Sequence, residues 1–226
     1  MGQHRLRVHR HTYHRRHKLG SEHTSVPKKN VVARLKIETR GTVTAVSRVN
    51  NRSVFVYETA GTVFIIVLGS ILHFTFEWSG GNPVAGAFSA VNESVWEHLK
   101  LVFWPALLFM LIEYIPLKKT ANNFGLAKTT GVYLAVITIP IIFYSYTAVT
   151  GRSIFLIDIS TFVVAVIIGQ ISSYKLLTHK KLSENLDKIS LFLLVMLGIA
   201  FALFTFYPLQ LPVFRDPITG KYGVPQ

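Results

Sequence analysis

The sequence places histidine and carboxylate side chains at helical spacing between residues 73 and 98. His73 and Glu77 are four residues apart, as are Glu93 and Glu97, so each pair would share one face of a helix. Imidazole and carboxylate groups ligate divalent metals and also exchange protons. A divalent metal is therefore a candidate cofactor, although no catalytic residue can be assigned. The candidate ligands are His73, Glu77, Asn92, Glu93, Glu97, His98 and Asp158.

A second group of polar and aromatic residues could support these ligands. Its members are Trp96, Tyr144, Tyr146, Arg215 and Asp216. The aromatic ones have an alternative interpretation, because Trp and Tyr commonly anchor helices at a membrane interface.

Helix capping is a structural alternative for part of the ligand set. Ser94 and Glu97 fit a capping box, and Asn92 is a favourable N-cap residue. Glu93 would be stabilised by the helix macrodipole, and Glu97 could pair with Lys100 one turn later. Capping explains three residues less well, because charges within spans are usually paired and functional. These three are His73, Glu77 and Asp158.

These residues must be positioned by membrane helices. Half of the 226 residues are hydrophobic, and there is no Cys, which excludes disulfides and thiolate metal sites. A helix needs about 20 mostly apolar residues to cross the hydrocarbon core. The fold class is thus all-α, a polytopic bundle of five transmembrane helices. The predicted spans are 57–76, 95–115, 130–149, 154–177 and 189–211.

The distribution of basic residues predicts the orientation of the bundle. Lys and Arg are concentrated in the N-terminal tail and in the second and fourth loops, whereas residues 78–91 contain none. Because basic residues favour the cytoplasmic side, the N-terminus is expected inside and the C-terminus outside. The candidate ligands would then meet at the outer face, with His73, Glu77, Asp158 and one of Glu93 and Glu97 in one cavity. Glu113 is expected to snorkel to the inner headgroups.

The chain divides by composition into a tail, residues 1–52, and a transmembrane domain, residues 53–226. The tail contains 13 Lys and Arg against two Glu, and six of the nine histidines. It has little apolar surface to bury and is expected to be largely disordered and cytoplasmic. Anionic lipid headgroups are its expected partner, beside the bilayer itself, and the histidines could also capture metal. Nucleic acid is not expected, because aromatic residues are not interleaved with the basic ones.

Three motifs together resemble a known family. They are HFTFEWS from His73 with Asn82-Pro83, VNESVWEHLK from Val91, and LPVFRDPITGKYG from Leu211. They resemble a family of small bacterial integral-membrane proteins described only as a domain of unknown function. The resemblance implies a membrane location over about residues 57–224 and no activity.

The expected function is that of a multi-pass cell-membrane protein that binds, or passes, a small polar solute or cation at an outward-facing site. One alternative is a membrane-embedded, metal-dependent enzyme acting at the outer leaflet. Another is a non-catalytic accessory subunit whose polar residues cap helices. Gly-rich phosphate loops, His-Glu-x-x-His pairs and Gly-x-Ser-x-Gly motifs are absent from the sequence.

Overall fold

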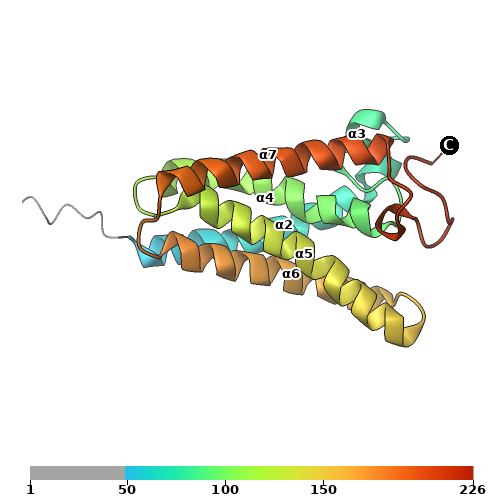
Figure 1. Ribbon diagram of the computed structural model, residues 1–226, viewed down its shortest axis with the longest axis horizontal. Helices are drawn as coiled ribbons and strands as arrows, with labels where there is room; N and C mark the ends of the chain where they lie inside the picture. Colours follow the sequence, from blue (N-terminus) through green and yellow to red (C-terminus); the bar gives the residue numbers. More distant parts are fainter. Residues whose placement is uncertain (1–48, 226) are drawn as a thin grey trace, which may run out of the picture. The chain divides into compact units, whose positions relative to one another are not determined.

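The computed structural model describes residues 49–225, which are helical over most of their length (Figure 1). This part of the chain contains six α-helices and one 3₁₀-helix, with no named strand, so the all-α class is confirmed. The elements are α2 (Asn51–Trp78), α3 (Pro83–Phe88), α4 (Val95–Leu117), α5 (Phe124–Thr150), α6 (Phe155–Leu177), α7 (Glu184–Phe206) and η1 (Pro212–Phe214). Nearly all of the predicted tail, residues 1–52, lies outside the described residues.

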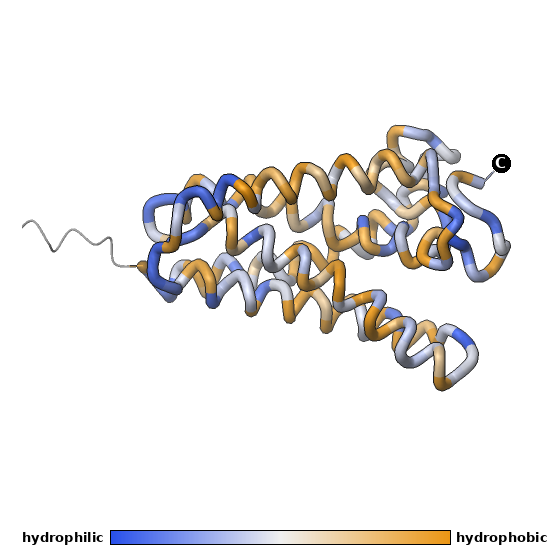
Figure 2. Tube along the Cα trace, in the orientation of Figure 1, coloured by the Kyte–Doolittle hydropathy of each residue, from blue (hydrophilic) through white to orange (hydrophobic). Residues whose placement is uncertain are grey.

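Five of these helices are long and apolar enough to cross a membrane, namely α2, α4, α5, α6 and α7. Figure 2 shows apolar residues along their length and the most hydrophilic stretches mainly at the two ends of the bundle. Large apolar side chains cover the outside, including Ile115 and Val149, which are 71% and 87% exposed. An apolar outer surface of this extent is typical of a protein surrounded by lipid.

Four of the predicted span boundaries are wrong. Helix α2 begins at Asn51, six residues before the predicted start. Helix α5 begins at Phe124, six residues before the predicted start, so Lys128 lies within the helix and not in a loop. Helix α7 begins at Glu184, where Ser183 caps it, and ends at Phe206. The prediction followed hydropathy alone, which excludes charged first turns and overlooks that Pro208 cannot extend a helix.

Close backbone contact at glycines holds the helices together. A Cβ atom added at Gly131 of α5 would lie 2.8 Å from the carbonyl oxygen of Gly169 in α6. On α2, a Cβ at Gly69 would lie 2.5 Å from the carbonyl oxygen of Leu101 in α4. Small residues at such crossings permit the approach that membrane helices use in place of hydrophobic burial.

The segment after α7 folds back over one end of the bundle. There Phe214 of η1 packs on Trp96, with ring centroids 4.7 Å apart. Asn92 donates a side-chain hydrogen bond to the carbonyl oxygen of Gly223 at 2.8 Å. Figure 1 shows α3 at the same end as the C-terminal segment. The fold thus brings together the ends of three sequence motifs that are far apart in the chain.

Candidate functional site

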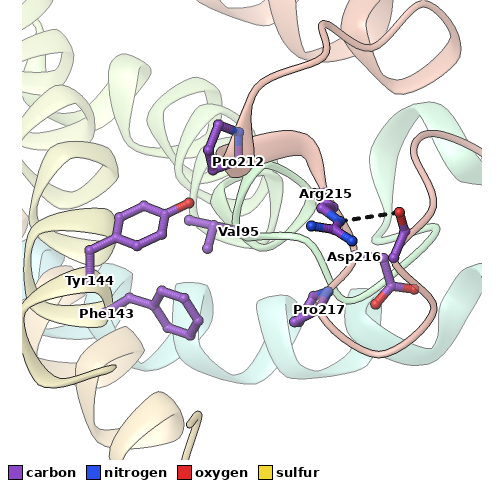
Figure 3. Close-up of a pocket in the computed structure, with 8 residues that line it drawn as sticks. Val95, Phe143, Tyr144, Pro212, Arg215, Asp216 and Pro217 are labelled. Carbon is purple, nitrogen blue, oxygen red and sulfur yellow. Dashed lines mark hydrogen bonds between the residues drawn. The ribbon is translucent and has the colours of Figure 1, made fainter. Parts of the chain in front are cut away.

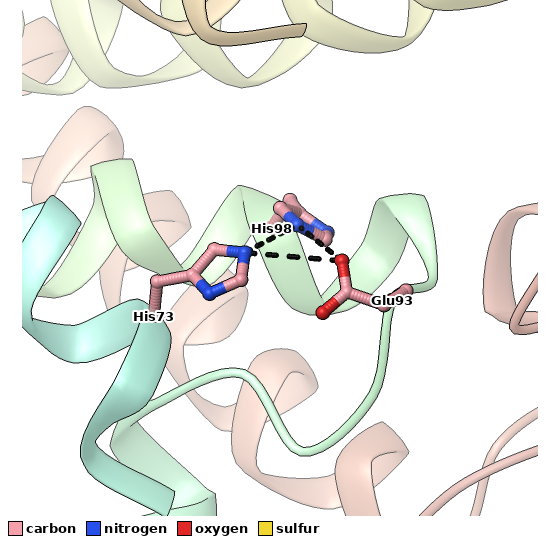
Figure 4. A group of neighbouring side chains, drawn as sticks. All are labelled: His73, Glu93 and His98. Atoms are coloured by element: carbon pink, nitrogen blue, oxygen red, sulfur yellow. Dashed lines mark hydrogen bonds and ion pairs between the residues drawn. The ribbon is translucent and has the colours of Figure 1, made fainter. Parts of the chain in front are cut away.

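Three potential metal ligands converge where α2 ends and α4 begins (Figure 4). His73 comes from the last turns of α2, Glu93 from the loop before α4, and His98 from the first turn of α4. The Nε2 atoms of the two histidines are 3.1 Å apart. The Oε2 atom of Glu93 lies 3.4 Å from Nε2 of His98 and 3.8 Å from Nε2 of His73.

These three distances fit the edges of a zinc coordination polyhedron. With Zn–N and Zn–O bonds of about 2.05 Å and tetrahedral angles, adjacent ligand atoms are about 3.3 Å apart. The observed separations, 3.1, 3.4 and 3.8 Å, bracket that value. The arrangement therefore needs only small side-chain rotations to hold a divalent ion.

The backbone fixes the orientation of the His98 ring. Its Nδ1 atom lies 2.8 Å from the carbonyl oxygen of Ser94, to which it donates when protonated. In the neutral ring this places the single proton on Nδ1 and leaves Nε2 free to coordinate, as hydrogen bonds to a ligating imidazole commonly do in metal sites. Ser94 is also the N-cap of α4, and its hydroxyl accepts from the Glu97 amide.

The charge state of Glu93 also suits a ligand. When His98 is protonated on both nitrogens, Nε2 donates to Glu93, and this hydrogen bond is the main reason that the pKa of Glu93 is lowered below the ordinary value. The carboxylate is thus ionised at neutral pH, and it is 43% exposed, whereas each histidine is 30% exposed. A metal held here would keep access to solvent at its remaining position.

Glu97 does not join this cluster, but its carboxylate bonds to the loop that carries Glu93. Its carboxylate is buried, pairs with Lys100 at 2.6 Å and accepts from the amide of Val91 at 3.0 Å. Lys100 also donates to the carbonyl oxygen of Gly86 and to the hydroxyl of Thr205, each at 2.7 Å. The network ties α3, α4, α7 and the loop containing Glu93 together.

The two remaining charged candidates lie apart from the ligand triad. Asp158 accepts a hydrogen bond from Tyr146, although it is close enough to His98 for its charge to act on the imidazole. Glu77 is exposed, one turn beyond His73. Of the residues predicted to share one cavity, His73 and Glu93 lie together, and His98, which is also a candidate ligand, joins them.

Three of the supporting candidates line a neighbouring hollow of about 340 Å³ (Figure 3). Tyr144 and Arg215 line it, with Val95, which lies in the turn of α4 before His98. Asp216 also lines it, but its carboxylate already accepts hydrogen bonds from the amide of Ile218 and the hydroxyl of Thr219. Among the described residues, the Arg215 guanidinium is bonded through Nε, to the Gly220 carbonyl at 3.3 Å, which leaves its terminal nitrogens to meet a ligand.

The sequence did not predict a second polar cluster, which lies inside the bundle. Glu58 and Glu113 both pair with Lys128 inside the bundle, and Glu113 is 1% exposed. The expectation that Glu113 snorkels to headgroups is wrong, because an ion-pair partner is available within the protein. Glu58 lies inside the predicted first span, 57–76, so the rule that flags charges within spans would have selected it.

Comparison with known proteins agrees with the resemblance seen in the three motifs. A family model described as a family of unknown function (DUF6512) matches residues 46–224, which include every residue of both clusters. No curated protein and no solved structure matches the chain. The matched region covers all five long helices and the C-terminal segment, and the chain belongs to the DUF6512 family.

Proposed function

We propose that this protein is a multi-pass membrane protein that binds a divalent metal ion of the zinc class through His73, Glu93 and His98. The observation that supports it most is the spacing of the three ligand atoms, together with the Ser94 carbonyl that orients His98. Two imidazoles and one carboxylate are a common zinc ligand set, and they leave a fourth position for water or a substrate.

The proposed orientation places this centre at the outer face of the membrane. The short loop between α5 and α6 and the loop between α2 and α4 lack the basic residues that gather in the tail and in the loops at the opposite end, apart from Arg152. This asymmetry favours the N-terminus inside. We propose that the protein binds the ion and does not pass it, because the cavity beside Gln170 measures about 10 Å³, which is room for about one water.

Metal binding can be tested on the full-length protein once the tail histidines, which could also bind metal, are replaced. The six tail histidines would be replaced by Asn, so that His73, His98 and the distant His179 are the histidines that remain. Zn²⁺ titration by calorimetry should then show one site. The variants H73A, H98A and E93Q should each weaken binding by at least roughly 10–100-fold, the loss already typical of disturbing a supporting partner.

Glu77→Gln is the matched control, because Glu77 lies one turn from His73 on the same helix and is exposed. It should bind Zn²⁺ like the parent. The proposal fails if the parent binds no Zn²⁺, or if E77Q weakens binding as much as E93Q does.

A second candidate function is a metal-dependent enzyme acting on an anionic headgroup. The observation that favours it is the hollow of about 340 Å³, which places the Arg215 guanidinium near the first turn of α4. A guanidinium recognises phosphate oxygens with two parallel hydrogen bonds. Zn²⁺-loaded protein should then bind a short-chain phospholipid, and R215Q should lose that binding while retaining Zn²⁺. Equal binding by R215Q would remove this candidate.

A further inference from the structure

A buried group of three charged residues lies near the other end of the bundle. Lys128 of α5 reaches the Glu58 carboxylate of α2 at 2.5 Å and also contacts the Glu113 carboxylate of α4. The side chains of Glu58 and Lys128 are each 5% exposed, and that of Glu113 is 1% exposed. Ser173 of α6 donates its hydroxyl to Glu58 at 3.0 Å. Four helices thus enclose the group.

The charges of this group do not balance. Two carboxylates meet one ammonium, so the fully ionised group has one negative charge in excess. The second oxygen of each carboxylate, Oε2 of Glu58 and Oε2 of Glu113, is buried without a hydrogen-bond partner in the part of the chain that the structure describes. Uncompensated charge and unpaired polar atoms are both costly away from water.

The buried pair at the opposite end provides a contrast. Glu97 and Lys100 balance one to one, and both oxygens of Glu97 and the Lys100 ammonium have partners. Within residues 49–225, four buried side-chain polar atoms lack a partner, and these include the Oε2 atoms of both Glu58 and Glu113. The imbalance is therefore a property of this one group and not of buried charges in the bundle generally.

We propose that Glu58 and Glu113 together hold one exchangeable proton, which neutralises the excess charge on the group. Two carboxylates that share a site in this way titrate as a pair, and the proton belongs to both. With the proton bound, the group consists of one carboxylate, one carboxylic acid and one ammonium, and its net charge is zero.

The chemistry of the surroundings favours a proton over a cation such as Ca²⁺ or Mg²⁺. These ions need six or more oxygen ligands or retained water. The site offers the two free carboxylate oxygens and the Ser173 hydroxyl, and the Gln170 amide beside them donates to the backbone of Glu58 at 3.2 Å. Helix α7 presents Asp187 to the start of α5, where it accepts from the amide of Leu126. Lys128 already occupies the position between the two carboxylates.

Infrared spectroscopy of the full-length protein can observe the proton directly, because a carboxylic acid and a carboxylate absorb at different frequencies. At neutral pH the wild type should show a protonated-carboxyl band that disappears reversibly at alkaline pH. Both E58Q and E113Q should lose the whole band, since either change leaves one carboxylate opposite Lys128 and no excess charge. Glu97→Gln, in the balanced pair, should retain it.

The variants E58D and E113D keep both acids and protect the test against misfolding of the Gln variants. Each should retain the band at a shifted frequency. A wild type without the band at neutral pH overturns the proposal. So does a band that survives in E58Q or in E113Q, which would assign the proton to a single residue. Loss of the band on adding Na⁺ or K⁺ at constant pH would overturn it in favour of a metal cation.

Discussion

Removing the ammonium from the buried Glu97–Lys100 pair should strongly destabilise the fold. In Lys100→Met, the Lys100 hydrogen bonds to Glu97, Gly86 and Thr205 are lost. The Glu97 carboxylate stays buried with only the Val91 amide and the Thr205 hydroxyl as donors. Breaking a buried ion pair by removing one partner costs about 3–5 kcal/mol.

The double variant E97Q/K100M should recover part of this loss, because a neutral amide no longer needs a counterion. A coupling energy of about 1–3 kcal/mol between the two sites is expected, as for residues in one network. Reversible unfolding in mixed detergent micelles, followed by tryptophan fluorescence, measures these differences.

The exposed pair Lys181–Glu184 provides the matched control. It has the same three-residue spacing and a distance of 3.0 Å, but its side chains are 67% and 74% exposed. Lys181→Met should leave the free energy of unfolding nearly unchanged, because solvent screens an exposed pair. The reasoning is refuted if K100M costs less than about 1 kcal/mol, or if the double variant is as unstable as the sum of the single ones.

Three further predictions concern the metal centre and the topology. Gly69→Ala should lower both thermal stability and Zn²⁺ affinity, because its Cβ would meet the Leu101 carbonyl oxygen at 2.5 Å, one turn from the metal ligands; unchanged affinity by calorimetry would contradict this. The pKa of Glu93 is lowered by its hydrogen bond with protonated His98, so its contribution to stability should be present just above pH 4.5, where the imidazole carries its proton, and disappear as the pH falls through the lower folded value. Melting curves of wild type and E93Q should therefore differ just above pH 4.5 and converge in stronger acid. A cysteine at Gly81 should react with an impermeant reagent on intact cells and one at Lys119 should not, and the reverse pattern would invert the proposed orientation.

The helices were predictable because hydropathy alone identifies long apolar runs. Their ends were less so, since hydropathy treats Lys128 as a loop residue, whereas α5 includes it and pairs it with Glu58, 70 residues earlier. A partner that far away in sequence leaves no local pattern. The same limit applies to His73 and Glu93. Both were selected from the sequence, but no local pattern shows that they contact each other.

Glu97 shows a different limit of the sequence. Its spacing from Ser94 predicts a capping box, and its spacing from Lys100 predicts an ion pair. The structure contains the ion pair, and the carboxylate reaches past Ser94 to the amide of Val91. Both interpretations were available from the sequence. The packing of α3 and α7 around Glu97 buries it, so that it cannot act as a solvent-facing ligand.

The antiparallel pair α2 and α4 contributes residues to both polar clusters, and this constrains the length of each helix. His73 and Glu58 on α2, and His98 and Glu113 on α4, are separated by the same number of residues, which at 1.5 Å per residue is about 22 Å. At 3.6 residues per turn, one residue inserted between the two positions of either helix would rotate one cluster member about 100° away from its partners. Natural relatives should therefore tolerate neither insertions nor deletions between these positions, so that the interval is constant in length even where its residues vary.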